Sequence, residues 1–227
     1  GVVGAMPFIY SEVMLSTPRG VKGAALRGIE PQKAPHVLTL SQDMTQGSLD
    51  SLQDDSALPG LVIGSGMAGQ LGVSTGQTVN MLSPSGTKSA AGFTPRVKPF
   101  QIVGIFDTGM YEYDSSLAYT SLGAAQEILG FEEDLASGLE IRLQNVYAAE
   151  QVADQLREKL QGFPFLVQTW MDMNQSLFSA LKLEKTAMGV ILIMIVLVGS
   201  FSIITTLIML VMEKKQDIAV LMSMGAK

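Results

Sequence analysis

The stretch TAMGVILIMIVLVGSFSIITTLIMLVM, from Thr186 to Met212, contains no charged residue and is almost entirely apolar. About 20 apolar residues span the hydrocarbon core of a bilayer, so this stretch is long enough to cross a membrane with some tilt. It lies near the end of the chain, whereas a secretory signal would be N-terminal and shorter. A helix buried in a large soluble core is a rarer alternative at this length. The sequence therefore predicts a transmembrane helix at residues 186–212.

The charge distribution predicts a large domain outside the membrane, on the N-terminal side of the helix. The 185 residues before Thr186 carry 12 basic and 19 acidic side chains, a net charge of −7, and the 15 residues after Met212 carry a net charge of +1. The positive-inside rule slightly favours a cytoplasmic position for the segment after Met212. An acidic domain argues against binding to nucleic acid or to an anionic membrane surface.

The residue inventory excludes several kinds of site. The chain has no cysteine and one histidine, His36, so disulfides, thiolate metal sites and histidine-based catalytic triads are not available. The carboxylates at Asp54-Asp55 and Glu132-Glu133-Asp134 favour solvated loops; a calcium site is a distant alternative because no calcium-loop pattern surrounds them. We predict no metal site and no cofactor.

Two short motifs are weak matches to catalytic or nucleotide-binding signatures. Gly64–Gly69 (GSGMAG) fits the dinucleotide-binding pattern, but no acidic residue follows before Asp107 and Gly72 would end the helix early. Ser179-x-x-Lys182 matches a serine–lysine pattern without its companion elements. We interpret the glycines as turn residues and the second motif as a solvated helix face, so no catalytic site is predicted.

Hydrophobic periodicity predicts a mixed α and β domain. The predicted strands are residues 2–10, 24–29, 36–40, 61–63, 78–82, 100–106, 116–119, 139–143 and 165–169. The predicted helices are residues 65–71, 122–129, 148–160 and 171–185, the last continuing without a break into the membrane.

The segment Ser83–Pro99 (SPSGTKSAAGFTPRVKP) is predicted to be a projecting loop, because its prolines and glycines interrupt strand and helix patterns alike. Its basic residues lie in a window from Ser56 to Phe106 that contains no acid. Phe93 would place an apolar ring at the tip, which suits docking of a partner. An ordinary hairpin loop with Phe93 folded back is the alternative.

Within the apolar stretch, Gly199, Ser202 and Thr206 form a line of small residues that permits close packing against other membrane helices. Neither the opening GVVGAMPF nor the closing MSMGAK resembles a natural terminus. We therefore expect the chain to be a fragment of a longer membrane protein.

Several motifs together resemble a known family. MEKKQDIAVLMSMGAK directly after the membrane stretch resembles the cytoplasmic segment of FtsX/MacB-like ABC permeases. LFSALKLEKTAM, GMYEYDSSLAY, LRGIEP and the opening GVVGAMPF resemble the lipoprotein-releasing permeases, the LolC/LolE family. The resemblance covers nearly the whole chain in the same order.

The resemblance implies an α+β periplasmic domain, residues 1–185, followed by a transmembrane helix, 186–212, and a cytoplasmic coupling segment, 213–227. Residues 1–21 and 139–185 would form a porter-like βαβ part, and residues 22–138 an inserted, strand-rich sabre-like part. The protein would lie in the bacterial inner membrane with residues 1–185 in the periplasm. It would be a non-enzymatic permease subunit, with ATP hydrolysed by a separate ATPase subunit.

The implied partners are that ATPase, a second permease subunit (the same or a sister chain), a lipoprotein substrate, membrane lipid and a periplasmic lipoprotein chaperone. The loop resembles the hook that holds the chaperone, with candidate residues Pro84, Lys88, Phe93, Thr94, Pro95, Arg96 and Lys98. Flexible or apolar side chains near the outer leaflet are candidate lipoprotein contacts: Leu177, Phe178, Leu181, Met188, Ile191 and Ile195. The last segment has a narrow apolar face with charged residues beside it. The candidate ATPase-coupling residues there are Glu213, Lys214, Asp217, Ile218 and Leu221.

Three alternatives remain open on the sequence alone. A MacB-like efflux permease would carry a fused ATPase and lack the hook. An FtsX-like regulator would use its outer domain to activate cell-wall hydrolases. A sensor receptor would carry a signalling module after the membrane helix.

Overall fold

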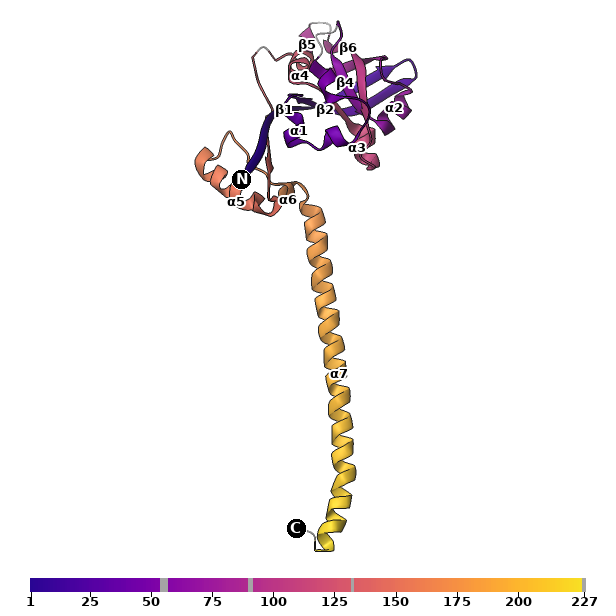
Figure 1. The fold of residues 1–227 in the computed structure, drawn as a ribbon, viewed down its shortest axis with the longest axis vertical. Helices are drawn as coiled ribbons and strands as arrows, with labels where there is room; N and C mark the ends of the chain where they lie inside the picture. The colour runs from indigo at the N-terminus through magenta and orange to yellow at the C-terminus, as the bar shows by residue number, and fades with distance from the viewer. Residues whose placement is uncertain (54–56, 90–91, 132, 226–227) are drawn as a thin grey trace. The chain divides into compact units, whose positions relative to one another are not determined.

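The computed structural model describes residues 1–53, 57–89, 92–131 and 133–225. At residues 87–89, 92 and 93 it describes the backbone alone. The chain forms two compact units, Gly1–Ala148 and Ala149–Lys227, and each is described by itself below (Figure 1). The predicted division into porter-like and sabre-like parts stays a prediction.

The first unit is built on a ring of paired strands that closes on itself. The ring runs through β1 (Val2–Thr17), β2 (Gly20–Ile29), β7 (Leu117–Ser121), β4 (Gly60–Gly64), β6 (Gly92–Phe106) and β5 (Thr78–Ser89), and β5 pairs again with β1. The pairs β2–β7 and β4–β6 are parallel, and the others in the ring are antiparallel. Closure leaves no open edge within the ring.

Two further strands attach to this ring. β8 (Gly138–Leu143) pairs with the first half of β1, and β3 (Met44–Gly47) pairs with the end of β6. Arg27 of β2 reaches across β1 to an ion pair with Glu140 of β8 at 2.5 Å, and its guanidinium lies 5.1 Å from the centre of the Phe8 ring. Side chains as well as backbone pairing therefore hold β8 on the ring.

The strands separate two apolar cores, because successive side chains of a strand point to opposite faces. In β4, Leu61 and Ile63 belong to the larger core, whereas Val62 belongs to the smaller one. The larger core is covered by α2 (Ser65–Leu71) and α4 (Leu122–Leu129), which bury Met67 and Ala125. The bounds of both helices are those predicted from the sequence.

The smaller core lies beneath α1 (Ala34–Val37) and the 3-10 helices Leu40–Gln42 and Leu49–Gln53. Phe106 and Tyr119 meet there edge to face at 5.6 Å, and burial raises the pKa of the Tyr119 phenol. The predicted strand at residues 36–40 is wrong, because this segment instead packs α1 and a 3-10 turn over the sheet.

The prediction that the glycines of GSGMAG are turn residues is wrong, because Gly66 and Gly69 lie within α2 and Gly64 precedes it in an extended conformation. A Cβ on Gly64 would lie 2.2 Å from the carbonyl oxygen of Asp114, so only glycine lets β4 approach α3 (Tyr111–Ser116) this closely. Gly72 adopts a left-handed conformation with φ of 63° and ends α2 after seven residues.

The predicted absence of regular structure at residues 83–99 is wrong. β5 and β6 continue through this segment as a paired hairpin, from Thr78 opposite Gln101 to Ser89 opposite Gly92. The register shifts between Ser83 and Gly86, which accommodates Pro84 at a bulge. Pairing with a neighbouring strand thus overrides the local breaker signals.

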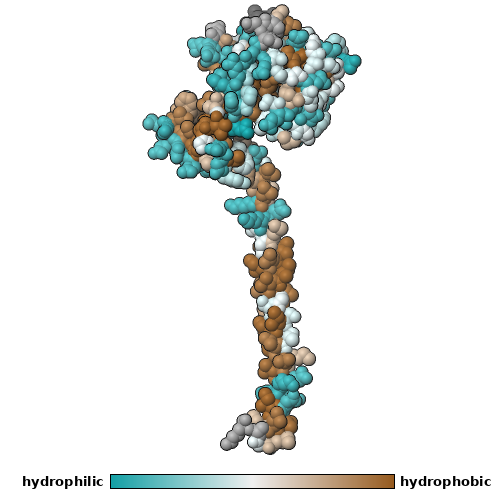
Figure 2. Space-filling view, in the orientation of Figure 1, coloured by the Kyte–Doolittle hydropathy of each residue, from teal (hydrophilic) through white to brown (hydrophobic). Residues whose placement is uncertain are grey.

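The second unit contains α5 (Ala149–Leu160), α6 (Trp170–Met173) and α7 (Gln175–Ser223). At 1.5 Å per residue, the 49 residues of α7 extend about 74 Å. In the described part of the chain α7 is the one helix long and apolar enough to cross a membrane, and none of it is buried. Figure 2 shows its apolar surface between two hydrophilic bands.

Two predictions for the second unit are wrong. Residues 165–169 do not form a strand, and the helix predicted to start at residue 171 is interrupted at Asn174, between α6 and α7. The capping box of Thr169 and Asp172 fixes the start of α6. The break follows Met173, because Asn174 has a φ of −111° and a ψ of 31°, outside the helical range. The predicted continuation of the helix through residues 175–212 is confirmed.

Phe100 tests the larger core. It is fully buried on β6, so Phe100→Ala should cost about 3–5 kcal/mol of stability through lost burial and a cavity. Val97→Ala on the same strand is the control, because Val97 is 56% exposed and its loss should change stability by at most about 0.5 kcal/mol. Urea unfolding in detergent, followed by near-ultraviolet circular dichroism, measures both. Equal losses would contradict this core assignment.

Candidate functional site

The β5–β6 hairpin has a buried base and an exposed outer part. Val79, Met81 and Phe100 lie in the core at its base, and Ser83 is buried where the register shifts. Beyond the shift, Gly86 pairs with Pro95. We call residues 84–95 the arm. It extends from the ring as a two-stranded ribbon whose base is fixed by the core.

The predicted chaperone-binding residues fall into three groups, two on the arm and a third, Arg96 and Lys98, at its base. Pro84, Thr94 and Pro95 are exposed on the arm. The backbones of Lys88 and Phe93 pair with each other, but their side chains lie outside the described residues, as do Ala90 and Ala91. The structure therefore brings the predicted residues onto one hairpin.

Arg96 and Lys98 at the base of the arm contact α4. Lys98 forms an ion pair with Glu127, and the Arg96 guanidinium donates to the Glu127 carbonyl at 3.4 Å. The Arg96 guanidinium also covers Gly130, which caps the helix in a left-handed conformation. A cation at a helix C-terminus is favourable. These two cations stabilise the base of the arm, which the sequence did not predict.

Five of the six predicted lipoprotein-binding residues share one face of α7. At 100° per residue, the following residues fall within an arc of about 80°: Leu177, Leu181, Met188, Ile191 and Ile195. All five are at least half exposed. Gly199, Ser202 and Thr206 continue the same face. Phe178 lies outside this arc and packs edge to face on Trp170 at 5.3 Å.

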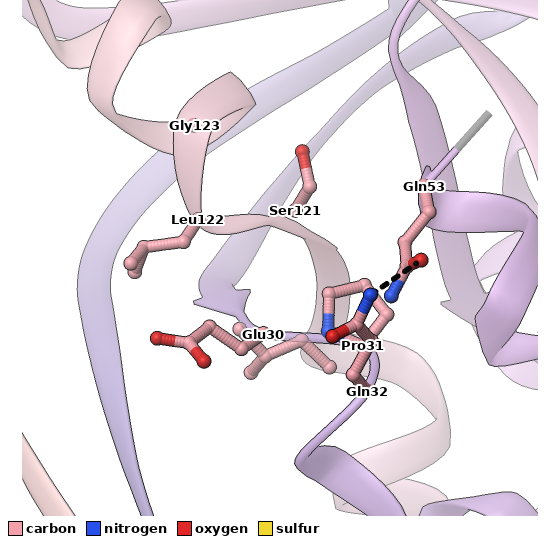
Figure 3. Close-up of a pocket in the computed structure, with 8 residues that line it drawn as sticks. Glu30, Pro31, Gln32, Gln53, Ser121, Leu122 and Gly123 are labelled. Carbon is pink, nitrogen blue, oxygen red and sulfur yellow. Dashed lines mark hydrogen bonds between the residues drawn. The ribbon is translucent and has the colours of Figure 1, made fainter. Parts of the chain in front are cut away.

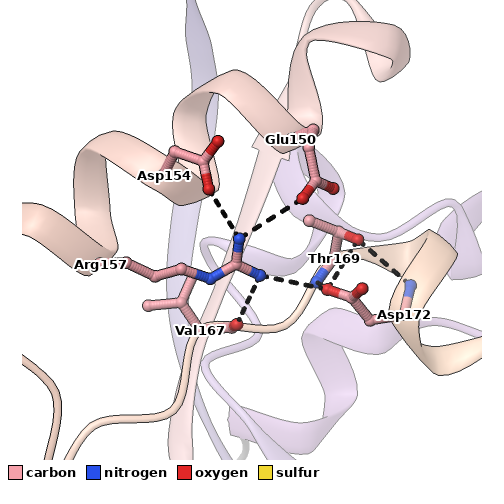
Figure 4. Close-up of polar contacts among 6 residues, drawn as sticks. All are labelled: Glu150, Asp154, Arg157, Val167, Thr169 and Asp172. Atoms are coloured by element: carbon pink, nitrogen blue, oxygen red, sulfur yellow. Dashed lines mark hydrogen bonds and ion pairs between the residues drawn. The ribbon is translucent and has the colours of Figure 1, made fainter.

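The residues before α7 form a polar cluster around Arg157 (Figure 4). Its guanidinium donates to Asp154 at 2.9 Å, to Glu150 at 3.4 Å, to the Val167 carbonyl at 3.2 Å and to Asp172 at 3.3 Å. One side chain thus contacts α5, the segment after α5 and α6. We call these residues the Arg157 cluster.

Asp172 also completes the cap of α6. Its carboxylate accepts from the Thr169 N–H at 2.9 Å and from the Thr169 hydroxyl at 3.0 Å, and the hydroxyl accepts from the Asp172 N–H at 3.2 Å. The Thr169 backbone N–H, followed by the Thr169 hydroxyl, lowers the pKa of Asp172, and the charge of Arg157 contributes. Hydrogen bonds to Asp154 and Glu150 raise the pKa of Arg157.

Sequence reasoning missed the Arg157 cluster. The pattern Thr169-x-x-Asp172 is a signal that could have located the start of α6. Nothing local indicates that Arg157, 15 residues earlier, meets this cap.

The predicted ATPase-coupling residues lie on the last turns of α7, which runs without a break to Ser223. Lys214 and Asp217 form an ion pair at 3.0 Å, and Ile218 and Leu221 are both 54% exposed. The segment predicted at residues 213–227 is thus helical as far as Ser223.

A surface depression of about 230 Å³ lies beside the end of β2 and the start of α4 (Figure 3). It is smaller than ordinary ligand pockets, about 300–1,000 Å³. Gln32 and Gln53 on its wall hydrogen-bond to each other at 3.3 Å, and Glu30 pairs with Lys33 at 2.6 Å. The side chains of Gln32, Gln53 and Glu30 therefore already have partners within the protein. Within the described ranges no group of three or more metal-binding side chains occurs.

Comparison with known families decides the classification. The MacB-like periplasmic core domain matches residues 2–159. The chain belongs to the MacB-like periplasmic core domain family. The family match covers residues 2–148 of the first unit and all of α5 except Leu160, whereas α6 and α7 lie beyond the matched residues. The predicted fold class, a mixed α and β domain followed by a long apolar helix, is confirmed.

Relatives extend the similarity over nearly the whole chain. This MacB-like chain is 36% identical to the lipoprotein-releasing system transmembrane protein LolC of Xylella fastidiosa, over 99% of the chain and 53% of that protein. It is 32% identical to LolC of Neisseria meningitidis, over 99% of the chain and 54% of that protein. The chain spans about half the length of the curated relatives it matches. The predicted resemblance to the LolC/LolE permeases is confirmed.

Among solved structures, the periplasmic region of MacB from Actinobacillus actinomycetemcomitans matches with a TM-score of 0.47 and 13% identity, over 76% of this chain and 74% of that one. The extracellular domain of YknZ from Gram-positive bacteria matches with a TM-score of 0.46 and 14% identity, over 71% and 78%.

The cap of α6 predicts a specific titration. Because the folded pKa of Asp172 is lowered, its carboxylate stabilises the cap at all pH values above the ordinary value of 3.8, and this stabilisation is lost as the pH falls through the lower folded pKa. Carbon-13 NMR of the Asp172 carboxyl group should give a midpoint below 3.8. Thr169→Ala and Arg157→Gln should each raise it, whereas Asp154→Asn should not. A wild-type midpoint at or above 3.8 would contradict the cap.

Proposed function

We propose that this chain is part of the permease subunit of an ABC transporter that extracts lipoproteins from the bacterial inner membrane and passes them to a periplasmic chaperone. The observation that carries the proposal is the 36% identity to a lipoprotein-releasing protein over 99% of this chain. The long apolar helix α7 supports a membrane-embedded role.

The proposed topology places residues 1–185 in the periplasm, 186–212 in the inner membrane and 213–227 in the cytoplasm. The hydrophilic bands on either side of the apolar part of α7 support these limits (Figure 2). We retain the porter-like part at residues 1–21 and 139–185 and the sabre-like part at residues 22–138 as part of this proposal.

In this proposal a separate ATPase subunit hydrolyses ATP, and a second permease subunit completes the membrane part. Glu213, Lys214, Asp217, Ile218 and Leu221 would contact the ATPase. Their position on the same unbroken helix as the membrane stretch supports this role, because a continuous helix transmits a displacement along its axis.

The direct test is release of lipoprotein by the full-length transporter. Proteoliposomes containing the permease, its ATPase and an acylated lipoprotein should deliver the lipoprotein to added periplasmic chaperone only when ATP is hydrolysed. A second candidate, MacB-like efflux, is favoured by the family match alone. It predicts export of small molecules from the same proteoliposomes and no transfer of lipoprotein to the chaperone.

The shared face of α7 predicts where the lipoprotein enters. Leu177, Leu181, Met188, Ile191 and Ile195 would contact acyl chains, and the thioether of Met188 adapts to irregular apolar shapes. A photocrosslinker at Met188 should label the lipoprotein strongly. A crosslinker at Val190, on a different face and 53% exposed, is the matched control and should label less. Phe178, which packs on Trp170, should give intermediate labelling. Equal labelling at Met188 and Val190 would contradict the proposal that this face of α7 contacts the lipoprotein.

The arm is the proposed chaperone dock. Phe93 would supply an apolar anchor, so Phe93→Ala should weaken chaperone binding by about 1–3 kcal/mol. Lys88, Arg96 and Lys98 would attract an acidic rim, so binding should weaken with salt.

The pairing of Ser83 with Arg96 allows a cleaner variant than a simple deletion. Replacing residues 84–95 with Asn-Gly closes the hairpin by a two-residue turn and keeps the contacts of Arg96 and Lys98 with α4. Pull-down by the chaperone should fail with this variant while the melting temperature stays near that of the parent. Retained binding would identify the arm as an ordinary hairpin.

A further inference from the structure

The second unit lacks an apolar core of its own among the residues described. Of residues 149–225 only Ala153 and Thr169 are buried. Several apolar side chains that precede α7 are well exposed, such as Phe163 at 99% and Leu166 at 80%, and Val152, Leu156 and Val167 are only half-buried. Because so little apolar surface is buried, apolar packing alone does not fix the position of α5 relative to α7.

The contacts between α6 and α7, in contrast, are well defined. Trp170 packs on Phe178, the Asn174 side chain donates to the Trp170 carbonyl at 2.7 Å, and the Phe178 N–H donates to the Asn174 carbonyl at 3.2 Å. We call α6 with Asn174 the foot of α7. Any group fixed to Asp172 is thereby fixed to α7.

Arg157 joins α5 to this foot through its hydrogen bond and ion pair with Asp172. Its contacts with Asp154 and Glu150 lie within α5. The contact with Asp172 crosses to the foot, and the contact with the Val167 carbonyl reaches the segment just before the foot. A single exposed ion pair contributes little, but a planar guanidinium with acceptors from three segments restrains direction as well as distance. Asp172 is itself held by Thr169, so Arg157 contacts a carboxylate already in a fixed place.

We propose that Arg157 is a positioning residue that fastens α5 to the foot of α7, so that a movement of the membrane helix displaces α5 with it. This inference rests on the proposed function, in which movement driven by the ATPase must reach the periplasmic domain. Arg157 contacts neither substrate nor nucleotide in this role; it keeps two helices in one rigid body.

The cluster provides its own matched controls. Asp154 and Asp172 both bond to Arg157, but Asp154 lies on the same helix as Arg157 and Asp172 lies on the foot. Asp154→Asn removes one negative charge and leaves the contact between Arg157 and Asp172 in place. Asp172→Asn removes the same charge from the link and leaves an amide oxygen that can still accept from Thr169. Arg157→Gln removes the link from the other side.

The first measurement is lipoprotein release per ATP hydrolysed, with the full-length permease assembled with its ATPase in proteoliposomes. Arg157→Gln should lower this ratio on the order of fivefold while ATP hydrolysis continues, Asp172→Asn should lower it less, and Asp154→Asn should match the parent. Equal ratios for Arg157→Gln and Asp154→Asn would overturn the proposal.

The second measurement does not depend on transport. The chain has no cysteine, so Glu158→Cys on α5 and Ser179→Cys on α7 place a spin-label pair in the full-length subunit once any cysteines elsewhere in it are replaced by serine. The distance distribution should be narrow in the parent and in Asp154→Asn, and broad in Arg157→Gln. An unchanged distribution in Arg157→Gln would overturn the rigid link. If the parent released no lipoprotein, the proposed function would be wrong. The spin-label distances would still show whether Arg157 fixes α5 relative to α7.

Discussion

A peptide backbone inside a bilayer must satisfy its hydrogen bonds internally, because lipid offers none. Residues 186–212 meet this requirement, because they form part of one helix, Gln175–Ser223. The hydroxyl groups of this helix are also hydrogen-bonded within it. Thr186, Ser200 and Thr206 each donate to the carbonyl four residues earlier. The segments on both sides of the apolar stretch therefore belong to one continuous helix, and the proposed roles of its two ends depend on that continuity.

In the first unit the corresponding constraint is closure of the strand ring. β1 is long enough to pair with β2 and β5 along its second half and with β8 along its first half. The ion pair of Arg27 with Glu140 joins β2 to β8 across it. A closed ring has no free edge to bend, so it provides a stiff base from which the β5–β6 arm extends. The contacts of Arg96 and Lys98 with α4 brace the arm at that base.

The two units are stabilised by different physics. The first buries large side chains such as Phe100 and Phe106 in two cores, so its shape follows from packing. The second buries almost nothing among its described residues and relies on capping, ring contacts and the Arg157 cluster. Polar contacts are weaker than core packing but directional. A unit built on them can be rigid in one direction and yield in others, which suits a connection that carries movement.

The sequence by itself determined the features whose cause is local. The charge-free stretch predicted the long apolar helix. The glycines Gly72 and Gly130 ended α2 and α4, and the motifs taken together identified the family. Tertiary structure alone decided the rest. The prolines of residues 83–99 favour a loop locally, yet pairing between strands made a hairpin. The segment at residues 36–40 favours a strand, yet packing over the second core made a helical turn. The partners of Arg157 lie up to 15 residues away, and a periodic pattern does not encode contacts between elements, because those depend on where folding places each surface.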